Sequence, residues 1–361
     1  KHGIKLVLGY TVEGFKEKDN GVEVLLKDNP SLQADMVVLA IGVTPDTVLA
    51  KEAGLELGIK ESIVVNDRME TSVPDIYAAG DAVQVKHYVT GNDALISLAG
   101  PANKQGRIIA DNICGGDSRY LGSQGSSVIK VFDMTAATTG INETNAKKSG
   151  LDVDTVILSP MSHAGYYPGG KVMTMKVIFE KESYRLLGAQ IIGYEGVDKR
   201  IDVLATAIHA GLNATQLKDL DLAYAPPYSS AKDPVNMAGF MIDNIAKGTL
   251  KQWHLEDMDK ISKDKDVVLL DVRTVGEFSR GHIDGFKNIP VDELRERISE
   301  IEKGKPVYLI CQSGLRSYIA SRILEGNGYE TYNFSGGFRF YDAVVNDRAL
   351  IERTYACGMD Y

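Results

Sequence analysis

The run from Val307 to Ser317 constrains this chain most, because it describes a buried strand that delivers one cysteine into a tight loop followed by a helix. Residues 307–310 are apolar and suit a core strand, and the pattern over 317–324 predicts a helix. Gly314 between them permits backbone angles that other residues avoid. The sequence therefore predicts that Cys311 ends a strand and begins a loop whose backbone amides converge on one point.

The residues of this loop suit the chemistry of sulfur. Backbone N–H groups, the start of the following helix and Arg316 would favour a thiolate at Cys311 over a thiol. The same groups could hold a terminal persulfide or an anionic substrate. The simpler alternative is that Cys311 is a small hydrophobic residue at the end of a core strand, as most free cysteines are.

The surroundings of the loop resemble the rhodanese family. The motifs that carry this resemblance are 269–273, 277–278, 281–283, 288–290, 311–316 and 335–337. The resemblance implies that Cys311 carries a persulfide as the catalytic residue together with Arg316, and that Asp271, Arg273 and His282 have structural roles. It also implies a substrate cradle formed by Gln312, Ser313, Gly314 and Leu315.

Composition excludes several classes of function. The chain has 361 residues, of which 44% are hydrophobic and 25% charged, as expected for two or three soluble globular domains. A net charge of −9 argues against nucleic acid or an anionic membrane as partner. Three cysteines are too few and too scattered for a disulfide framework or a metal site, which indicates a cytoplasmic protein without a metal. Of these, Cys114 is expected to be a packing residue, and Cys357 is not expected to be catalytic.

The amino-terminal residues suggest the later part of a nucleotide-binding unit. The chain begins with Lys1, and strands are predicted at 5–9, 22–26 and 36–42. No G-x-G-x-x-G sequence follows a strand, so we expect the first strand and the phosphate-binding turn of such a unit to precede Lys1.

A second informative segment is 71–82, which predicts a strand that ends at Gly80 and Asp81. A carboxylate there can accept hydrogen bonds from a sugar alcohol, and Gly80 lets the backbone approach a phosphate. By itself the Gly-Asp pair is equally typical of an ordinary turn.

The longer segment resembles the second flavin motif of the pyridine nucleotide-disulfide oxidoreductases. Residues 40–46 resemble the segment that leads back to that family's flavin domain, and 98–107 resemble a helix that starts under the flavin ring. The resemblance implies FAD and NAD(P)H as cofactors, with Asp81 on the ribitol and 98–102 on the pyrimidine side, where a helix start stabilises negative charge. The implied cofactor-binding residues are Ile41, Gly42, Gly80, Asp81, Ala82, Leu98, Ala99, Pro101 and Ala102, and Asn103 is assigned to the substrate.

The middle of the chain predicts a mostly antiparallel sheet with helices after it. Strands are predicted at 128–132, 155–158, 171–179 and 186–193, and helices at 198–210 and 234–246. This order resembles the dimerisation domain of the same oxidoreductases. The resemblance implies a homodimer in which this domain completes the active site of the partner subunit.

Two loops of this region, 163–169 and 222–229, are rich in tyrosine. A tyrosine can hydrogen-bond a developing thiolate and act as an acid, although tyrosines are also common at dimer interfaces. The placement resembles the coenzyme A disulfide reductases, which implies catalytic roles for Tyr166 and Tyr224, with Tyr167 and Tyr228 as alternatives. Lys232 either meets an oxygen of coenzyme A or is a solvated surface lysine.

Together these features predict an α/β chain in three parts. We expect the remaining parts of Rossmann-type NAD(P)- and FAD-binding domains at 1–126, an α+β dimerisation domain at 127–248 and a rhodanese-like α/β domain at 249–361. The combination resembles coenzyme A disulfide reductases fused to a rhodanese, which also act on persulfide or polysulfide. The resemblance places the redox cysteine upstream of Lys1.

Two other functions remain open on the sequence alone. The rhodanese-like part could dock a sulfur-carrier protein without performing chemistry, or the chain could belong to an NADH oxidase or peroxidase of the same fold. The sequence leaves open which small sulfur compound is the acceptor and whether NADH or NADPH is the donor.

Overall fold

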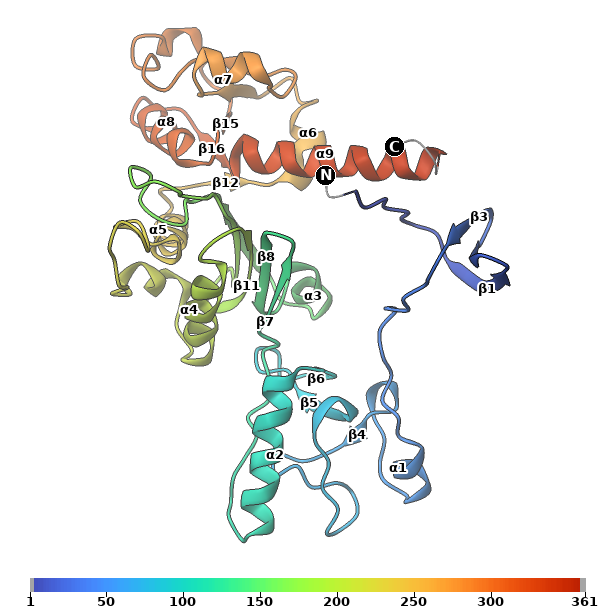
Figure 1. Cartoon of the computed structure of the whole chain (residues 1–361). Helices are drawn as coiled ribbons and strands as arrows, with labels where there is room; N and C mark the ends of the chain where they lie inside the picture. Colours follow the sequence, from blue (N-terminus) through green and yellow to red (C-terminus); the bar gives the residue numbers. More distant parts are fainter. Residues whose placement is uncertain (1–2, 358–361) are drawn as a thin grey trace. The chain divides into compact units, whose positions relative to one another are not determined.

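The computed structural model describes residues 3–357, and side chains within 3–347. The chain divides into two compact units, one made of 1–43 with 341–361 and the other of 44–340. Figure 1 shows the chain coloured along its sequence. The C-terminal helix α9 (Gly337–Cys357) contributes residues to both units. The side chain of Cys357 lies outside the described residues.

The first unit contains a small antiparallel sheet. It is formed by β1 (Val12–Lys18), β2 (Gly21–Leu26) and β3 (Asn29–Ala34) in the order β1-β2-β3. The predicted strand at 22–26 is confirmed as β2, whereas those at 5–9 and 36–42 are wrong, because both segments are irregular. A strand needs a neighbouring strand for its backbone hydrogen bonds. Instead, Val38 and Ile41 are 77% and 89% exposed.

The second unit begins with a small α/β layer around Met69, Val83 and Val85. Its elements are α1 (Val48–Glu52), β4 (Ile63–Val64), β5 (Val83–Lys86), β6 (Asp93–Ala94) and α2 (Ala99–Ile113), with the 3-10 turns η1 (Ile59–Glu61) and η2 (Gly80–Ala82). The strands have the order β4-β5-β6. The predicted helix at 98–107 is confirmed as the first part of α2.

The strand predicted to end at Gly80-Asp81 is wrong, because Gly80–Ala82 forms the turn η2 and strand β5 begins only at Val83. Gly80 adopts a φ of +83°, which extended backbone does not use. Its N–H donates to Gln105 Oε1 of α2 at 2.7 Å. The helix thus holds this segment as a turn against its own first half.

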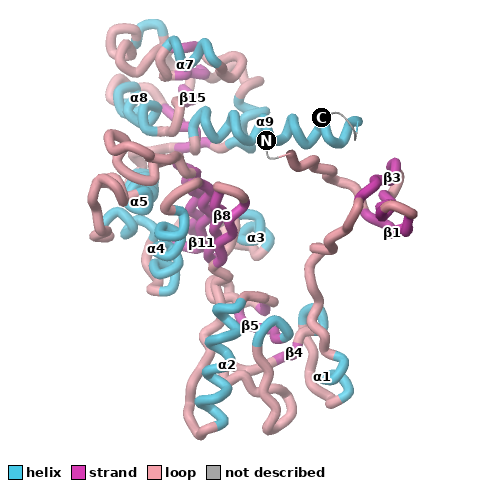
Figure 2. Tube along the Cα trace, in the orientation of Figure 1, coloured by secondary structure: helices cyan, strands magenta, loops and turns pink. Residues whose placement is uncertain are grey.

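The middle of the second unit is a five-stranded antiparallel sheet with order β7-β8-β11-β10-β9. Figure 2 labels two of its strands, β8 and β11. The four predicted strands and two predicted helices are confirmed; β8 and α3 were not predicted. The strands are β7 (Ser127–Val131), β8 (Met134–Gly140), β9 (Val153–Leu158), β10 (Thr174–Glu180) and β11 (Leu186–Gly193). The helices are α3 (Glu143–Lys148), α4 (Val197–His209), the 3-10 helix η3 (Ala214–Asp219) and α5 (Pro234–Ala246).

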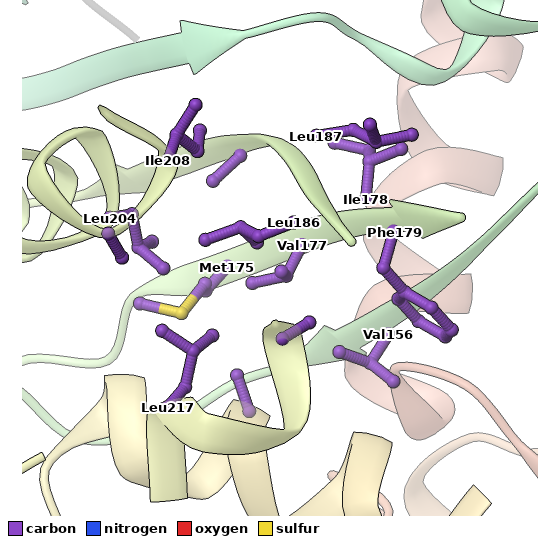
Figure 3. Close-up of a cluster of buried hydrophobic side chains, with 14 of the residues drawn as sticks. Val156, Met175, Val177, Ile178, Phe179, Leu186, Leu187, Leu204, Ile208 and Leu217 are labelled. Atoms are coloured by element: carbon purple, nitrogen blue, oxygen red, sulfur yellow. The ribbon is translucent and has the colours of Figure 1, made fainter. Parts of the chain in front are cut away.

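One continuous cluster of buried apolar side chains packs the helices of this region against the sheet. Side chains of β9, β10 and β11 meet those of α4 and η3, as Figure 3 shows for Val156, Met175, Val177, Leu204 and Leu217. All five are fully buried. Burial of apolar surface on this scale is the main force that keeps helices on a sheet.

The last part of the second unit is a parallel sheet with order β12-β16-β15-β13-β14. The strands are β12 (Gln252–Trp253), β13 (Val268–Asp271), β14 (Lys287–Asn288), β15 (Val307–Ile310) and β16 (Thr331–Phe334). The helices are η4 (Leu255–Asp257), α6 (Met258–Ile261), α7 (Val275–Arg280), η5 (Ile298–Glu300) and α8 (Leu315–Glu325). The predicted strand before Cys311 is confirmed as the central strand β15, and the predicted helix after it as part of α8.

The five-stranded antiparallel sheet and the parallel sheet of this unit are joined by hydrogen bonds at strand β9. The Ile157 N–H donates to Ser335 Oγ at 3.1 Å, and Gln252 Nε2 donates to the Thr155 carbonyl at 2.8 Å. His254 Nε2 lies 3.0 Å from Asp154 Oδ1. Burial alone would raise the pKa of Asp154, but the hydrogen bond with His254 and further donors hold the pKa below its usual value.

Two general features concern the described part of the chain. None of its helices is both long and apolar enough to cross a bilayer. Within the same residues, no three side chains of His, Cys, Asp or Glu gather in a way that would bind a metal ion.

Candidate active site

Cys311 follows the central strand β15 and is 1% exposed. Its Sγ accepts from the Gly314 N–H at 3.1 Å and lies 3.2 Å from Ser317 Oγ, whose one proton can be donated to the sulfur or to the Gly314 carbonyl at 3.1 Å. Gly314 reaches this position with a φ of +102°, which a residue with a side chain rarely adopts. The loop therefore aims a backbone donor and a hydroxyl of α8 at one sulfur atom.

The first residues of α9 hold the backbone of the loop from behind. The Phe338 N–H donates to the Cys311 carbonyl at 2.8 Å, and the Arg339 N–H donates to the Gln312 carbonyl at 3.2 Å. At Gly337, a Cβ atom would lie 2.7 Å from the Ser313 nitrogen. A glycine at 337 thus allows the two segments to touch, and the loop is fixed by main-chain contacts.

Arg316 directs its hydrogen bonds away from the cysteine. Its two terminal nitrogens each donate to an oxygen of Glu277 at 2.7 Å. The hydrogen bond from Arg316, together with the N–H and hydroxyl of Thr274, lowers the pKa of Glu277 to about 2, against the opposing effect of burial. The guanidinium of Arg316 is thus paired with a carboxylate, and its role at Cys311 stays a prediction.

Asp271 and Arg273 form a buried ion pair below the loop. Arg273 Nη2 lies 2.7 Å from Asp271 Oδ2, and both side chains are 1% exposed. The guanidinium also donates to the Gly281 carbonyl at 2.8 Å and stacks 3.9 Å from the ring centre of Phe338. A contact of 3.4 Å links it to Gln312 Oε1 of the loop.

The outer side of the loop faces a pocket of about 400 Å³. Ser313, Gly314 and Leu315 line it on one side, and residues of α5 line it on the other. Lys232 also lines this pocket, with its Nζ 5.8 Å from the ring centre of Phe240. The structure thus brings Lys232 to the same pocket as the cysteine loop.

The structure joins two of the four candidate tyrosines. The hydroxyl oxygens of Tyr166 and Tyr224 lie 2.9 Å apart, and both side chains are exposed. The hydrogen bond with Tyr166, followed by the loss of solvent around the hydroxyl, raises the pKa of Tyr224. Tyr167 instead packs edge-on against His163.

Arg200, which sequence reasoning missed, connects the tyrosine-rich loops from within. It is 1% exposed and donates to Asp233 Oδ2 at 2.9 Å and to the Ser162 carbonyl at 3.0 Å. It also donates to Ser229 Oγ at 3.1 Å. The available sequence signal was an arginine on the apolar face of α4, three residues after Val197 and four before Leu204, since a charged residue buried there needs partners from distant segments.

The candidate flavin residues fall into two groups. Gly80, Asp81 and Ala82 form the turn η2 beside the start of α2, where a Cβ on Gly80 would lie 3.9 Å from Ala102 Cβ. The start of α2 has no side-chain cap and no acidic residue in its first turn. Leu98, Ala99, Pro101, Ala102 and Asn103 belong to this helix start. Ile41 and Gly42 lie in the other compact unit, in an irregular exposed segment.

Comparison with known families accounts for this arrangement. Residues 1–106 match the pyridine nucleotide-disulphide oxidoreductases, 126–234 match the dimerisation domain of that family, and 254–343 match the rhodanese-like domain. The chain belongs to the pyridine nucleotide-disulphide oxidoreductases that carry a rhodanese-like domain. The sheet β7–β11 is thus the dimerisation domain, and the sheet around Cys311 is the rhodanese-like domain.

Solved structures of the family are similar over most of the chain. The reduced CoADR-RHD of Bacillus anthracis is 47% identical with a TM-score of 0.90, covering 94% of this chain and 60% of its own. The NAD-dependent persulfide reductase of A. fulgidus is 41% identical with a TM-score of 0.83, covering 92% and 61%. The NAD(P)H sulfur oxidoreductase (CoA-dependent) of Pyrococcus abyssi is 37% identical over 65% of this chain and 52% of its own length. The chain spans about half the length of the curated relatives it matches.

Proposed function

We propose that the whole protein is an FAD-dependent NAD(P)H reductase of coenzyme A disulfide, coenzyme A persulfide or polysulfide, in which Cys311 transfers sulfane sulfur. The observation that carries the sulfur-transfer part is the pair of donors, Gly314 N–H and Ser317 Oγ, on the Sγ of Cys311. The names of the similar proteins from B. anthracis, A. fulgidus and P. abyssi support the reductase part.

In the proposed transfer, the thiolate of Cys311 attacks the outer sulfur of a donor such as thiosulfate. A new S–S bond forms on Cys311, the S–S bond of thiosulfate breaks, and sulfite leaves with the electron pair. Donors placed around a sulfur atom stabilise its negative charge, both in the thiolate and in the persulfide that follows. Gly314 and Ser317 occupy these positions before any substrate binds, so little reorganisation is required.

The residues near α2 fit a flavin. An exposed carboxylate at Asp81 lies in the turn next to an uncapped helix start, and such a start favours negative charge. We assign Asp81 to the ribitol and the first turn of α2 to the pyrimidine side, with Gly80 and Ala82 in the turn that holds them. FAD supplies electron transfer from NAD(P)H when bound.

We assign the proton donor for a leaving thiolate to Tyr166 and Tyr224. Tyrosine hydroxyls are protonated near neutral pH, and the hydrogen bond between the two hydroxyls orients both side chains. A homodimer would place this pair in the partner subunit's active site. Lys232 would meet an anionic oxygen of the coenzyme A substrate.

The test of the sulfur-transfer part uses thiosulfate and then cyanide. The chain should gain the mass of one sulfur atom and then release thiocyanate, because cyanide takes the outer sulfur and returns Cys311 to the thiolate. Cys311→Ser should abolish both steps, whereas Cys114→Ser should leave them intact. The expectation that Cys114 is a packing residue is wrong, because its thiol is free and exposed. Wild-type chain that binds no sulfur, or a Cys311→Ser variant that still releases thiocyanate, would reject the proposal and favour a docking role.

A further inference from the structure

The carbonyl oxygen of Gly314 has more hydrogen-bond donors around it than it can use. The Tyr318 N–H donates to it at 3.0 Å and Asn333 Nδ2 donates to it at 3.1 Å. Ser317 Oγ also lies 3.1 Å from the same oxygen. Because a carbonyl oxygen has two lone pairs, it takes two good hydrogen bonds, and one of the three donors is free to bond elsewhere.

Ser317 is the donor that has a second acceptor within reach. Its Oγ lies 3.2 Å from Cys311 Sγ, and the residue is fully buried. The Tyr318 N–H, in contrast, is fixed by the backbone of α8, where it makes the regular helical bond to the fourth residue before it. A serine hydroxyl rotates and carries one proton, so it can serve the sulfur or the carbonyl but not both.

Asn333 is held rigidly by the parallel sheet. It lies in β16, where it is opposite Gln252 of β12 on one side and Leu309 of β15 on the other. Because Cys311 directly follows β15, the amide of Asn333 reaches the cysteine loop from the neighbouring strand. The residue is 3% exposed, which shields its hydrogen bond to the Gly314 carbonyl from water.

We infer that Asn333 is a positioning residue that directs the proton of Ser317 onto the sulfur of Cys311. With the Tyr318 N–H, it occupies both lone pairs of the Gly314 carbonyl, and the hydroxyl of Ser317 then donates to Sγ. Without the amide, the carbonyl offers the hydroxyl an open lone pair, and the proton is divided between oxygen and sulfur. The inference rests on the proposed function and adds a residue that acts on the sulfur through Ser317.

A double-mutant cycle on sulfur loading from thiosulfate tests the inference. Asn333→Leu removes the donor at nearly constant volume and should lower the loading rate at saturating thiosulfate about three- to ten-fold, as expected for one hydrogen bond. The thiosulfate concentration that gives half the maximal rate should not change, because the amide acts on the sulfur of the chain. In Ser317→Ala, which has no hydroxyl to direct, Asn333→Leu should lower the rate by less than about two-fold.

Two further variants complete the design. Asn327→Leu makes the same substitution near the other end of α8, where Nδ2 donates to the Ile323 carbonyl at 2.8 Å, and should change neither kinetic constant. Asn333→Ala removes the same donor without new volume, so it carries the test if the leucine variant does not fold. The unfolding transition of Trp253 fluorescence shows which variants are folded.

The outcomes separate the inference from the proposed function. An equal loss of rate with and without the Ser317 hydroxyl would overturn the inference, because Asn333 would then act on the loop as a whole. An unchanged rate in a folded Asn333 variant would also overturn it. Both results leave sulfur transfer by Cys311 standing, whereas wild-type chain that gains no sulfur from thiosulfate would reject the proposed function itself.

Discussion

Arg316 and Glu277 face each other with two parallel hydrogen bonds of 2.7 Å each, one from each terminal nitrogen of the guanidinium. Glu277 also accepts from the N–H of Thr274 at 3.0 Å and so caps its own helix α7. The start of α8, which holds the cysteine loop, is thereby tied to the start of α7. A bidentate pair of this kind fixes geometry as well as charge.

Acid should remove the stabilisation that this pair contributes. The pKa of Glu277 is about 2 in the folded chain, below its ordinary value of 4.5, so the unfolded chain takes up the proton first. The contribution is therefore complete above about pH 4.5 and is lost as the pH falls toward 2. We expect the ion pair to contribute about 1–2 kcal/mol to the free energy of unfolding at neutral pH. The contribution is modest because both side chains keep some contact with water.

The measurement compares wild type with Glu277→Gln. Urea unfolding is followed by the fluorescence of Trp253, which is the single tryptophan and is buried in the rhodanese-like sheet. The difference in free energy of unfolding should shrink between pH 6 and pH 3. A difference that stays constant over this range would show that the ion pair is not the cause.

The local part of the site could be predicted from sequence. A strand of apolar residues, a glycine and a helix pattern are adjacent in the chain, so periodicity alone located Cys311 at the end of β15. The antiparallel strands β9, β10 and β11 were found for the same reason. Strand β8 was missed because residues 135–139 are all threonine or alanine, without large apolar side chains.

The contacts that complete the site could not be predicted in this way. Glu277 and Arg316 are 39 positions apart, and Arg200 and Asp233 are 33 apart, so no local pattern relates them. The strand predictions at 5–9 and 36–42 were wrong for the same reason. Whether a segment forms a strand depends on a partner strand that its own residues do not specify. The roles of the flavin, tyrosine and lysine residues stay predictions.

Removing the hydroxyl of Ser317 should slow sulfur transfer. Ser317 Oγ is 3.2 Å from Cys311 Sγ, and the variant Ser317→Ala leaves only the Gly314 N–H on the sulfur. The rate of sulfur loading from thiosulfate should fall about three- to thirty-fold, as expected for one hydrogen bond to a charged group. Ser321→Ala is the control, because that hydroxyl lies one turn later on α8 and bonds the Tyr318 carbonyl. Equal rates in the two variants would mean that the hydroxyl does not act on the sulfur.

Breaking the buried pair of Arg200 and Asp233 should destabilise the dimerisation domain strongly. The side chains of these residues are 1% and 4% exposed, and Arg200→Met leaves the carboxylate buried without its main partner, which costs about 3–5 kcal/mol. The exposed Asp202→Asn on the same helix should change stability by less than about 0.5 kcal/mol.

The pair also predicts an acid dependence. Burial alone would raise the pKa of Asp233, but hydrogen bonds from Arg200, Val235 and Ser229 lower it below its ordinary value. Stability from this group is therefore present at neutral pH and is lost as the pH falls below the ordinary range of aspartate. Thermal unfolding from pH 7 to pH 3 should show a shallower decline in Arg200→Met than in wild type. Parallel declines would contradict the assignment.

Two glycines of the rhodanese-like domain separate backbone strain from a steric clash at the cysteine loop. Gly337 and Gly328 both have positive φ, +68° and +84°, so an alanine at either strains the backbone by about 1–2 kcal/mol. A Cβ at Gly328 meets open space, whereas at Gly337 it lies 2.7 Å from the Ser313 nitrogen and 2.8 Å from the Cys311 carbonyl. Gly337→Ala should therefore cost a further 1–3 kcal/mol, roughly, from overpacking. It should also lower sulfur loading, because the displaced atoms belong to the loop that holds the sulfur. Equal losses of stability and activity in the two variants, measured by Trp253 fluorescence and thiosulfate loading, would show that the contact behind the loop does not position Cys311.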